Sequence, residues 1–408
     1  MEQFDLAIIG GGMSGLTLLS ALRKSIFSGL TVTLIDPADR PVNSQLSSPS
    51  FDDRATALSE QTLRIFNALA LPGIERTISN ITEIEVSDRG HAGSHQMLAS
   101  DMGFTRYGAV IANKALGTLL WQQVKDLPVD WRFNSEAQQL KPLQNGQQIS
   151  LSDGRVITAR QIILCDGGRS DLTTQLGLGL REKHFNARAR IATVTTREPH
   201  HGKAFERFTP TGPIALLPFG RFSALVWTVP EDNTELLEIT PKAAIEWLNT
   251  HLCNRLGGIS QISDWYEYPL IQKTLSTSCI HGLVATGNSA ATLHPVAGQG
   301  FNLAIRGIAR LAALINRHYT EQAELPGFHD FQQVCAEIEQ DQQKTVGFSG
   351  ELIRLFGSQS PLLQLGRNLG LGSLDRHPSF SKAFALGSMG LLESVPLEDI
   401  CYHDKETA

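Results

Sequence analysis

The strongest chemical signal in the sequence is the glycine-rich turn from Gly10 to Gly15, which follows an apolar run and precedes a helix-like one. In this G-x-G-x-x-G pattern, Gly10 permits a tight turn and Gly12 leaves room for a phosphate beside the backbone. Gly15 lets the following helix pack closely on the preceding strand. The helix N-terminus would add free N–H groups and a positive dipole end. The spacing predicts a binding turn for a dinucleotide pyrophosphate, with a ligand-free glycine turn as the alternative.

Asp36 supports the same interpretation. It follows the predicted strand 31–35 and lies 21 residues after Gly15. An acidic side chain at that position accepts hydrogen bonds from a ribose diol. Together, the turn and Asp36 predict an adenosine-containing cofactor.

A second candidate segment is Cys165 to Ser170, where a predicted strand ends in the dipeptide Asp166-Gly167. Asp-Gly is a common turn sequence, so an ordinary structural turn is the simpler interpretation of this segment by itself. A functional role therefore depends on the other motifs.

A third candidate segment runs from Gly287 to Asn302 and contains Pro295 and two close glycines, Gly298 and Gly300, before a helix-like run. Such a loop can present backbone N–H groups and a helix dipole to an electron-rich group. A purely structural loop is the alternative.

The elements that would position these turns have an α/β pattern. Runs 4–9 and 31–35 suit buried parallel strands, and run 13–24 between them suits a helix, which makes a βαβ unit. Runs 161–164 and 283–286 predict two more strands, each ending at a glycine-containing loop.

The middle of the chain has a different pattern, because β-branched and aromatic residues alternate there. This alternation is typical of antiparallel strands. The clearest such runs are 191–196, 204–209 and 222–229. Two later runs, 301–318 and 331–356, have helical periodicity.

We therefore predict a Rossmann-like domain with an inserted antiparallel-sheet domain and C-terminal helices. The predicted parts are 1–75, 100–175 and 271–345 for the first domain, 76–99 and 176–270 for the inserted domain, and 346–408 for the tail. Stretch 41–50 predicts a mobile surface loop. The apolar stretch 380–392 indicates a helix docked in the core. The alternatives are that this stretch contacts a prenyl tail, a partner protein or a bilayer surface.

Composition restricts the functional classes. With 408 residues, 41% hydrophobic and 19% charged, the chain is neither disordered nor a coiled coil. A formal net charge of −6 argues against nucleic-acid binding. Five cysteines without C-x-x-C spacing suggest no zinc site and fit a reducing, cytoplasmic compartment. We also expect neither export nor membrane spanning, since no signal-peptide pattern or long apolar window is present.

In order and separation, the three glycine-containing segments resemble the flavin motifs of single-component FAD-dependent aromatic monooxygenases. Further stretches resemble, more specifically, the polyprenylphenol hydroxylases of ubiquinone biosynthesis. These stretches are FDDRATAL at 51–58, VSDRGHAG at 86–93, AFERFTPTGPIALLP at 204–218, RLFGS at 354–358 and GRNLGL at 366–371.

The resemblance implies roles for individual residues. The Gly10 turn would hold the FAD pyrophosphate, with Asp36 at the adenosine ribose, and Asp166 with Gly167 would serve FAD and the approach of NAD(P)H. Arg54 would lie beside the flavin as a catalytic residue, with a solvated surface charge as its alternative. The other implied flavin neighbours are Asn113, Asn288, Pro295, Gly298, Gln299, Gly300 and Asn302, of which Pro295 would also be catalytic.

Three residues depart from the family pattern. Asn288 replaces a usual aspartate, which keeps an acceptor oxygen for a ribityl hydroxyl but loses the charge that strengthens the bond. Gly307 stands where an aspartate is common, and Thr173 where an arginine is common. These departures predict weaker flavin binding or altered NAD(P)H contacts within the same fold.

The resemblance implies an NAD(P)H-using FAD monooxygenase that hydroxylates a polyprenylated phenol of the 2-octaprenyl-6-methoxyphenol type through a flavin C4a-hydroperoxide. O₂ would be the second substrate, and no metal or nucleic acid would take part. The inner membrane surface and proteins of a quinone-synthesis complex are further candidate contacts. A flavin oxidoreductase that inserts no oxygen into a prenyl lipid, and a non-catalytic scaffold, are the alternatives.

Overall fold

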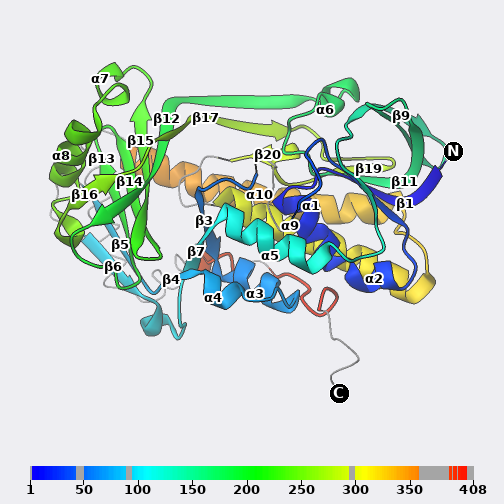
Figure 1. Cartoon of the computed structure of the whole chain (residues 1–408), viewed down its shortest axis with the longest axis horizontal. Coiled ribbons are helices and arrows are strands. Elements are labelled where there is room, and N and C mark those ends of the chain that lie inside the picture. Colours follow the sequence, from blue (N-terminus) through cyan, green and yellow to red (C-terminus); the bar gives the residue numbers. More distant parts are fainter. Residues whose placement is uncertain are drawn as a thin grey trace.

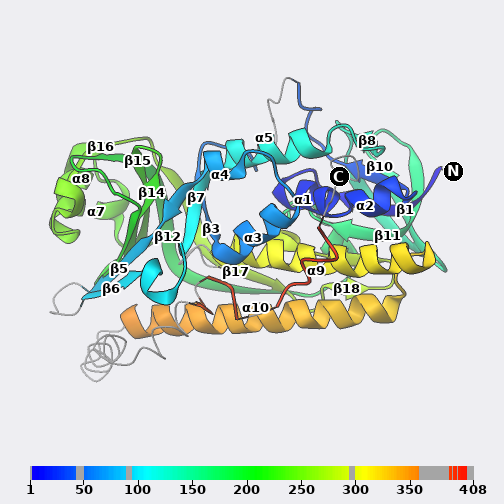
Figure 2. The same cartoon turned by 90° about the horizontal axis from the view of Figure 1, so that it is seen from below.

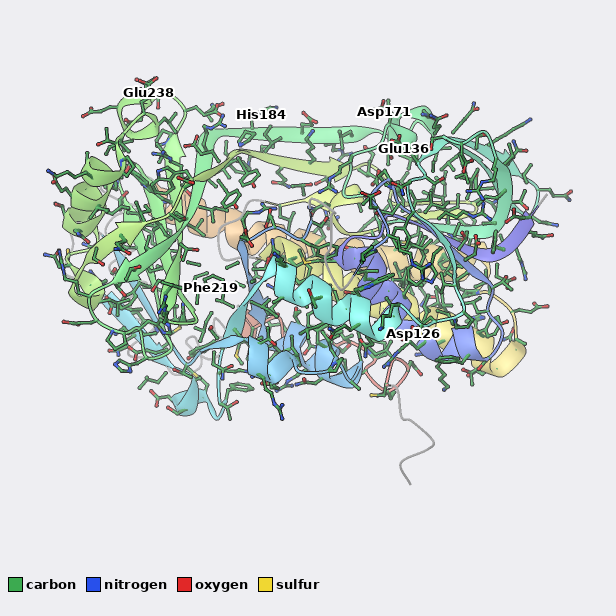
Figure 3. The ribbon with its side chains drawn as sticks, viewed as in Figure 1. Asp126, Glu136, Asp171, His184, Phe219 and Glu238 are labelled. Carbon is green, nitrogen blue, oxygen red and sulfur yellow. The ribbon has the colours of Figure 1, made fainter. Side chains whose placement is uncertain are left out.

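The structure is a computed structural model that describes residues 2–42, 50–88, 94–293, 299–357, 386–387, 389–392 and 394–401. These residues form two halves. A long antiparallel pair, β12 (Leu180–Thr196) and β17 (Tyr266–Leu275), runs from one half to the other (Figure 1). Figure 3 shows Glu136 and Asp171 in one half, Phe219 and Glu238 in the other, and His184 between them.

The first half is built on a parallel sheet with the order β19-β11-β1-β2-β8. Its strands are β1 (Glu2–Ile9), β2 (Val32–Ile35), β8 (Asp130–Arg132), β11 (Val156–Leu164) and β19 (Leu283–Ala285). At the edges lie β18 (Cys279–Ile280) and the hairpin β9 (Ala137–Leu143) and β10 (Gly146–Leu151). Leu6 and Ile8 are fully buried, as expected for a strand covered on both faces.

Helix α1 (Met13–Ala21) connects β1 to β2, so the predicted βαβ unit and Rossmann-like fold class are confirmed. The helix is shorter than the predicted run 13–24, since it ends at Ala21 and a separate short helix, α2 (Arg23–Phe27), follows. Arg23 donates hydrogen bonds to the carbonyls of Ser20 and Leu69. These bonds hold the break against the body of the protein.

Two long helices cover the first half. They are α9 (Gln299–Gln322) and α10 (Phe328–Gly357), which confirm and extend the predicted helices 301–318 and 331–356. Figure 2 shows α10 along the outside of the molecule, with α9 beside it. Helix α5 (Asn113–Val124) packs against α1.

A small three-stranded sheet lies near the junction of the two halves. Its order is β3-β7-β4, with β3 (Ala55–Ser59), β4 (Ser79–Ile81) and β7 (Gly108–Ala112). Helices α3 (Glu60–Ala68) and α4 (Ile74–Thr77) connect β3 to β4. The strand β3 therefore ends directly at the start of α3.

The second half is built on a nine-stranded sheet with the order β20-β17-β12-β15-β14-β13-β5-β6, to which β16 adds at β12. Its other strands are β5 (Glu83–Asp88), β6 (Ser94–Leu98), β13 (Lys203–Thr209), β14 (Gly212–Phe219), β15 (Phe222–Pro230), β16 (Ile259–Ile262) and β20 (Ala291–Thr292). The predicted antiparallel pattern needs one correction. Strands β13 and β5 pair in parallel, because a long stretch of chain separates them and no hairpin links them.

Short helices complete both halves. Helix α8 (Pro241–His251) and α7 (Thr234–Leu237) cover one face of the nine-stranded sheet, where Leu248 packs with Trp227. Helix α6 (Leu172–Gln175) follows the Asp166 turn. The strands of the second sheet span 83–98, 180–275 and 291–292, while the exact domain boundaries stay a prediction.

The C-terminal residues that are described pack on both halves, since Met389 joins the core cluster that includes Ala204 and Phe208 of β13, and Ile400 joins the core of the first half. Met389 and Ile400 are buried, and the Asn316 side chain on α9 donates a hydrogen bond to the Asp399 carbonyl. Most of the predicted core helix 380–392 and of the predicted loop 41–50 lies outside the described residues.

A buried ion cluster joins α9 to α10. Asp341 accepts two hydrogen bonds from Arg306, at 2.9 and 2.8 Å, and one from Arg310 at 2.8 Å. Burial favours a higher pKa for Asp341, but the hydrogen bonds and charges of the two arginines outweigh it and lower the pKa below its ordinary value. The cluster therefore holds a charged carboxylate between two guanidinium groups.

We expect Asp341→Asn to lower the free energy of unfolding by about 3–5 kcal/mol, because two buried guanidinium groups lose their counter-charge. Chemical denaturation followed by tryptophan fluorescence measures the change. Since the folded-state pKa is lowered, the wild-type contribution is present above the ordinary carboxyl pKa and is lost as the pH falls through the folded-state value. The variant should lack this acid dependence.

Arg317→Ala is the matched control. Arg317 pairs with Asp399 at the surface, where its side chain is 54% exposed. Its removal should change the stability by less than about 1 kcal/mol. Equal losses in the two variants would contradict the assigned role of Asp341.

Candidate active site

One large cavity, of about 1490 Å³, lies where the two halves meet. Its walls come from the β1–α1 turn, the end of β2, strand β3, the turns after β11 and β19, the start of α9 and one face of the nine-stranded sheet. Typical ligand pockets have volumes of roughly 300–1,000 Å³. This cavity has room for a large cofactor together with a second molecule.

The Gly10 turn has the geometry that a pyrophosphate site requires. Gly10 has φ +109°, and a Cβ there would lie 2.5 Å from the carbonyl oxygen of Cys165. A Cβ at Gly15 would lie 2.0 Å from the Gly10 carbonyl oxygen. Only glycine fits at either position, and the tight turn brings the start of α1 to the cavity.

The N-terminus of α1 is available to an anion. Gly12 precedes the helix without a side-chain cap, and Gly12, Met13 and Ser14 all line the cavity. Uncapped N–H groups and the positive end of the dipole there suit a phosphate. The residues present therefore fit the pyrophosphate of FAD.

Asp36 lies at the end of β2, beside the same turn. Its Oδ2 accepts a hydrogen bond from the Gly11 N–H and its Oδ1 accepts one from the Ala38 N–H. The side chain is buried except toward the cavity that it lines. Because each carboxylate oxygen has a further lone pair, Asp36 can also accept from a ribose hydroxyl.

Asp166 connects two of the predicted motifs. Its Oδ1 accepts hydrogen bonds from the Gly168 N–H at 2.9 Å and the Ser289 hydroxyl at 2.6 Å. Its Oδ2 accepts from the N–H and the hydroxyl of Ser170. The Ser289 hydroxyl also accepts from the Gly167 N–H at 3.0 Å. The carboxylate thus fixes its own turn and ties it to the turn after β19.

Arg54 and Asn113 are held by a shared acid, Asp52. The Arg54 Nε lies 2.5 Å from one Asp52 oxygen, and the Asn113 amide donates to the other at 3.0 Å. The Arg54 guanidinium also lies 4.7 Å from the ring centre of Tyr268, whose pKa is raised by burial. Arg54, Asn113 and Tyr268 line the cavity, so Asp52 sets two candidate cofactor contacts at once.

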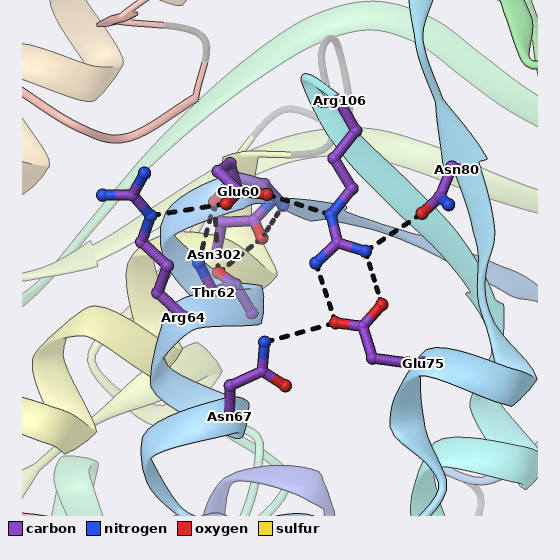
Figure 4. Close-up of polar contacts among 9 residues, drawn as sticks. Glu60, Thr62, Arg64, Asn67, Glu75, Asn80, Arg106 and Asn302 are labelled. Carbon is purple, nitrogen blue, oxygen red and sulfur yellow. Dashed lines mark hydrogen bonds and ion pairs between the residues drawn. The ribbon is translucent and has the colours of Figure 1, made fainter. Parts of the chain in front are cut away.

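Asn302 lines the cavity but uses its side chain inside the fold. Its Oδ1 accepts hydrogen bonds from the Ser59 N–H at 2.8 Å and the Thr62 hydroxyl at 2.7 Å (Figure 4). Its Nδ2 donates to the Ala57 carbonyl. These bonds join α9 to the end of β3 and the start of α3. Asn302 therefore positions the cavity wall.

Arg106 holds the neighbouring elements together in the same network (Figure 4). It pairs with Glu60 at 3.0 Å, binds both oxygens of Glu75 and donates to Asn80 at 3.1 Å. The hydrogen bonds from Arg106 lower the pKa of Glu75, and those to Glu75 and Glu60 raise the pKa of Arg106. This network fixes α3 against α4 and β4, and with them the position of β3.

Most of the predicted site residues come together at this cavity. Those that line it are Gly10, Gly12, Asp36, Arg54, Asn113, Asp166, Gly167, Asn288, Gln299, Gly300 and Asn302. Gly15 packs behind the turn instead, and Pro295 and Gly298 lie outside the described residues. The individual roles of these residues stay predictions.

The structure gives one of the departures from the family pattern a physical reason. A Cβ at Gly307 would lie 3.3 Å from the Ile338 side chain on α10. Gly307 therefore faces the contact between α9 and α10 and is absent from the cavity lining. Asn288 and Thr173 do line the cavity.

Several residues in or beside the cavity were not predicted from the sequence. Asp52 and Ser289 hold predicted residues by hydrogen bonds, and Tyr268 contacts Arg54. Glu206 also lines the cavity, on β13. The stretch around Glu206 resembles a family signature, but no local pattern encodes the strand pairing that brings β13 to the cavity wall.

Comparison with known families assigns the chain to a class. Residues 3–343 match the FAD binding domain family. The chain belongs to this family and is a flavoprotein, in agreement with the fit of the Gly10 turn.

Individual relatives show which members of the family the chain is similar to. The chain is 29% identical over 401 residues to ubiquinone hydroxylase UbiL of Rhodospirillum rubrum, covering 96% of this chain and 91% of the relative. It is 26% identical to 3-demethoxyubiquinol 3-hydroxylase of Escherichia coli, covering 91% and 95%. These relatives confirm the predicted resemblance to flavin hydroxylases of ubiquinone biosynthesis.

The fold is similar to that of p-nitrophenol 4-monooxygenase PnpA from Pseudomonas putida DLL-E4. The TM-score is 0.76 at 15% sequence identity, with 99% of this chain and 100% of that chain covered. Among the described residues, none of the helices combines the length and apolar character needed to span a membrane.

We expect Gly10→Ala to weaken flavin binding by about tenfold, and so to lower the flavin content of the purified protein, because the added methyl group must push the Cys165 carbonyl away. Overpacking of this kind costs about 1–3 kcal/mol, and about 1.4 kcal/mol corresponds to a factor of ten in affinity. The ratio of flavin to protein absorbance measures the change.

Gly103→Ala is the control, because Gly103 has φ +75° and its added Cβ would meet no described atom within 4 Å. It carries backbone strain without the clash and should keep its flavin. Full flavin content in both variants would contradict the assignment of the Gly10 turn.

Proposed function

We propose that the protein is an FAD-dependent hydroxylase that uses NAD(P)H and O₂ to insert one oxygen atom into the ring of a polyprenylated phenol, of the 2-octaprenyl-6-methoxyphenol type. The observation that carries the proposal is the shared cavity. A turn that fits the FAD pyrophosphate lines one part of it, and an apolar sheet face lines another. The names of the relatives support the substrate class.

The residues of the chain have distinct tasks in this proposal. FAD, when bound, supplies the redox chemistry between NAD(P)H and O₂. The N-terminus of α1 and Arg54 counter the negative charge of the cofactor, and Asp36 binds its ribose. The apolar face of the nine-stranded sheet keeps water away from the reacting ring.

The proposal extends to the surroundings of the protein. A polyprenylated phenol is strongly apolar and partitions into a bilayer, so we propose a cytoplasmic protein that collects its substrate at the inner membrane surface. Proteins of a quinone-synthesis complex are the proposed partners. The apolar cavity wall supports the choice of such a substrate.

Isotope-labelled O₂ tests the reaction directly. The purified yellow protein is incubated with NADPH or NADH, a short-chain prenylated methoxyphenol and ¹⁸O₂, and the product is weighed by mass spectrometry. We expect one labelled oxygen atom in the ring. A product oxidised without label would indicate an oxidoreductase that inserts no oxygen, and a flavin that neither nicotinamide reduces, even with substrate, would indicate a scaffold.

Arg54→Ala tests the cofactor end of the cavity. We expect weaker flavin binding and slower NAD(P)H-dependent hydroxylation, by about tenfold or more, because a charge-assisted contact to the cofactor is lost. Flavin titration and NAD(P)H consumption measure the two effects. Arg64→Ala, which removes an exposed arginine of α3 outside the cavity, is the control. Equal behaviour of the two variants would show that Arg54 has no cofactor role.

A further inference from the structure

One carboxyl group lies on the cavity face of the nine-stranded sheet. Strand pairing places five residues in a row, one on each of the neighbouring strands β15, β14, β13, β5 and β6. They are Val226, Ala215, Glu206, Val86 and His95. All five line the cavity. Glu206, on β13, is the central member of this row.

The alternation of β13 fixes the direction of the Glu206 side chain. Its neighbours Phe205 and Arg207 point to the opposite face, where Phe205 packs in the core beneath α8 and Arg207 donates to the His251 carbonyl. Residues of one strand alternate between the two faces of a sheet. Glu206 therefore shares its face with Ala204 and Phe208, which also line the cavity.

The surroundings of Glu206 are apolar. Its neighbours on the cavity wall include Ile84, Met97, Ala204, Phe208, Leu217 and Val226. Burial raises the pKa of Glu206 to about 7 and is the only cause of the shift, since no hydrogen bond or ion pair from the described residues contributes. The accessible surface that the side chain retains faces the cavity, which it lines.

An unpartnered carboxyl group in an apolar wall destabilises a protein, because the charged form loses its hydration. Leucine or valine would fill the same site without this loss. Buried groups with perturbed pKa values gather at functional sites because catalysis uses them. The position of Glu206 thus points to a polar group of the bound substrate.

We propose that Glu206 binds the phenol hydroxyl of the substrate and removes its proton during ring hydroxylation. This inference rests on the proposed function, in which the substrate is a phenol. On this mainly apolar stretch of the wall, the Glu206 carboxylate accepts the hydrogen bond that the hydroxyl donates. The hydrogen bond orients the ring and increases its electron density.

Glu206 takes up the phenol proton and later returns it. When a ring carbon takes up oxygen, the O–H bond of the phenol breaks, its proton passes to the Glu206 carboxylate, and its electron pair forms the C=O bond of a dienone. The ring carbon then releases its own hydrogen as a proton to solvent, and aromaticity returns. Glu206 gives its proton back to the phenol oxygen. One atom of O₂ enters the ring, the other leaves as water, and NAD(P)H supplies the two electrons.

Other ionisable groups share the cavity with Glu206 and must be separated from it in a pH profile. They are His95 on β6, Tyr107 before β7, and, elsewhere in the lining, Asp36, Arg54, Glu136, Cys165, Asp166, Arg169, Tyr268 and Lys273. Burial raises the pKa of Tyr107 to about 12 and also raises that of Tyr268. The two tyrosines therefore stay neutral near pH 7, and comparison of Glu206 variants isolates the carboxyl group from His95 and Arg54.

The test uses the flavin-loaded protein in three forms: wild type, Glu206→Gln and Glu206→Asp. Binding is measured by the change in the flavin spectrum with a short-chain prenylated methoxyphenol, and with the same compound in which hydrogen replaces the phenol hydroxyl. We expect the wild type to prefer the phenol by about tenfold or more, as for a hydrogen bond to a charged group. E206Q should lose most of this preference and keep its flavin.

Turnover gives a second readout. The wild-type kcat should rise as the pH increases through about 7, because only the deprotonated carboxyl can accept the proton. E206Q should lose this rise and have a kcat lower by about 100-fold, the usual effect of losing a general base. E206D keeps a carboxyl group and should keep the rise at a reduced kcat.

Glu238→Gln is the matched control, since Glu238 is an exposed carboxyl in the same half of the molecule (Figure 3). It should behave as the wild type in every assay. A wild type that incorporates no labelled oxygen would overturn the proposed function itself. Two results would overturn only the role of Glu206. In the first, the wild type hydroxylates the phenol and E206Q equals it in kcat, pH profile and preference for the hydroxyl. In the second, the pH profile of E206D is as flat as that of E206Q.

Discussion

The close backbone approach at Gly10 is the constraint on which the candidate site depends. The β1–α1 turn passes so near the end of β11 that a side chain at Gly10 would collide with the Cys165 carbonyl. This approach aims the N-terminus of α1 at the cavity and brings the Asp166 turn alongside it. Asp166 then holds the turn after β19 through Ser289. Three segments that are distant in sequence become one binding surface.

The cofactor half of the site could be predicted from the sequence because its signals are local. A glycine turn between a strand and a helix, with an acid at the end of the next strand, is encoded within residues 4–36. Three predicted residues that line the cavity, Gly10, Gly12 and Asp36, come from this stretch, whereas the other eight rest on the family resemblance. Residues such as Asn302 were harder to assign. Its contacts with Ser59 and Thr62 bridge two distant elements, and no local pattern encodes them.

The substrate half could not be predicted in the same detail because it depends on strand pairing. The parallel pairing of β13 with β5 places Glu206 beside Val86, and sequence periodicity contains no information on which strands become neighbours. Asp52 could not be predicted for the same reason, because its role comes from the hydrogen bonds by which it holds the side chains of Arg54 and Asn113. Local motifs thus identify the cofactor, whereas long-range register identifies the sheet wall of the cavity, where we propose that the substrate binds.

The alternation of the wall strands has a consequence for how such proteins diverge. Along β13, Phe205 packs in the core with α8 and Arg207 donates to the His251 carbonyl, while Ala204, Glu206 and Phe208 alternate with them and line the cavity. Mutations at cavity-facing positions can therefore change the shape of the cavity while the packed core and the glycine turn are inherited unchanged. Gene duplication followed by a few such substitutions would generate enzymes that share a cofactor and an architecture but modify different positions of related molecules.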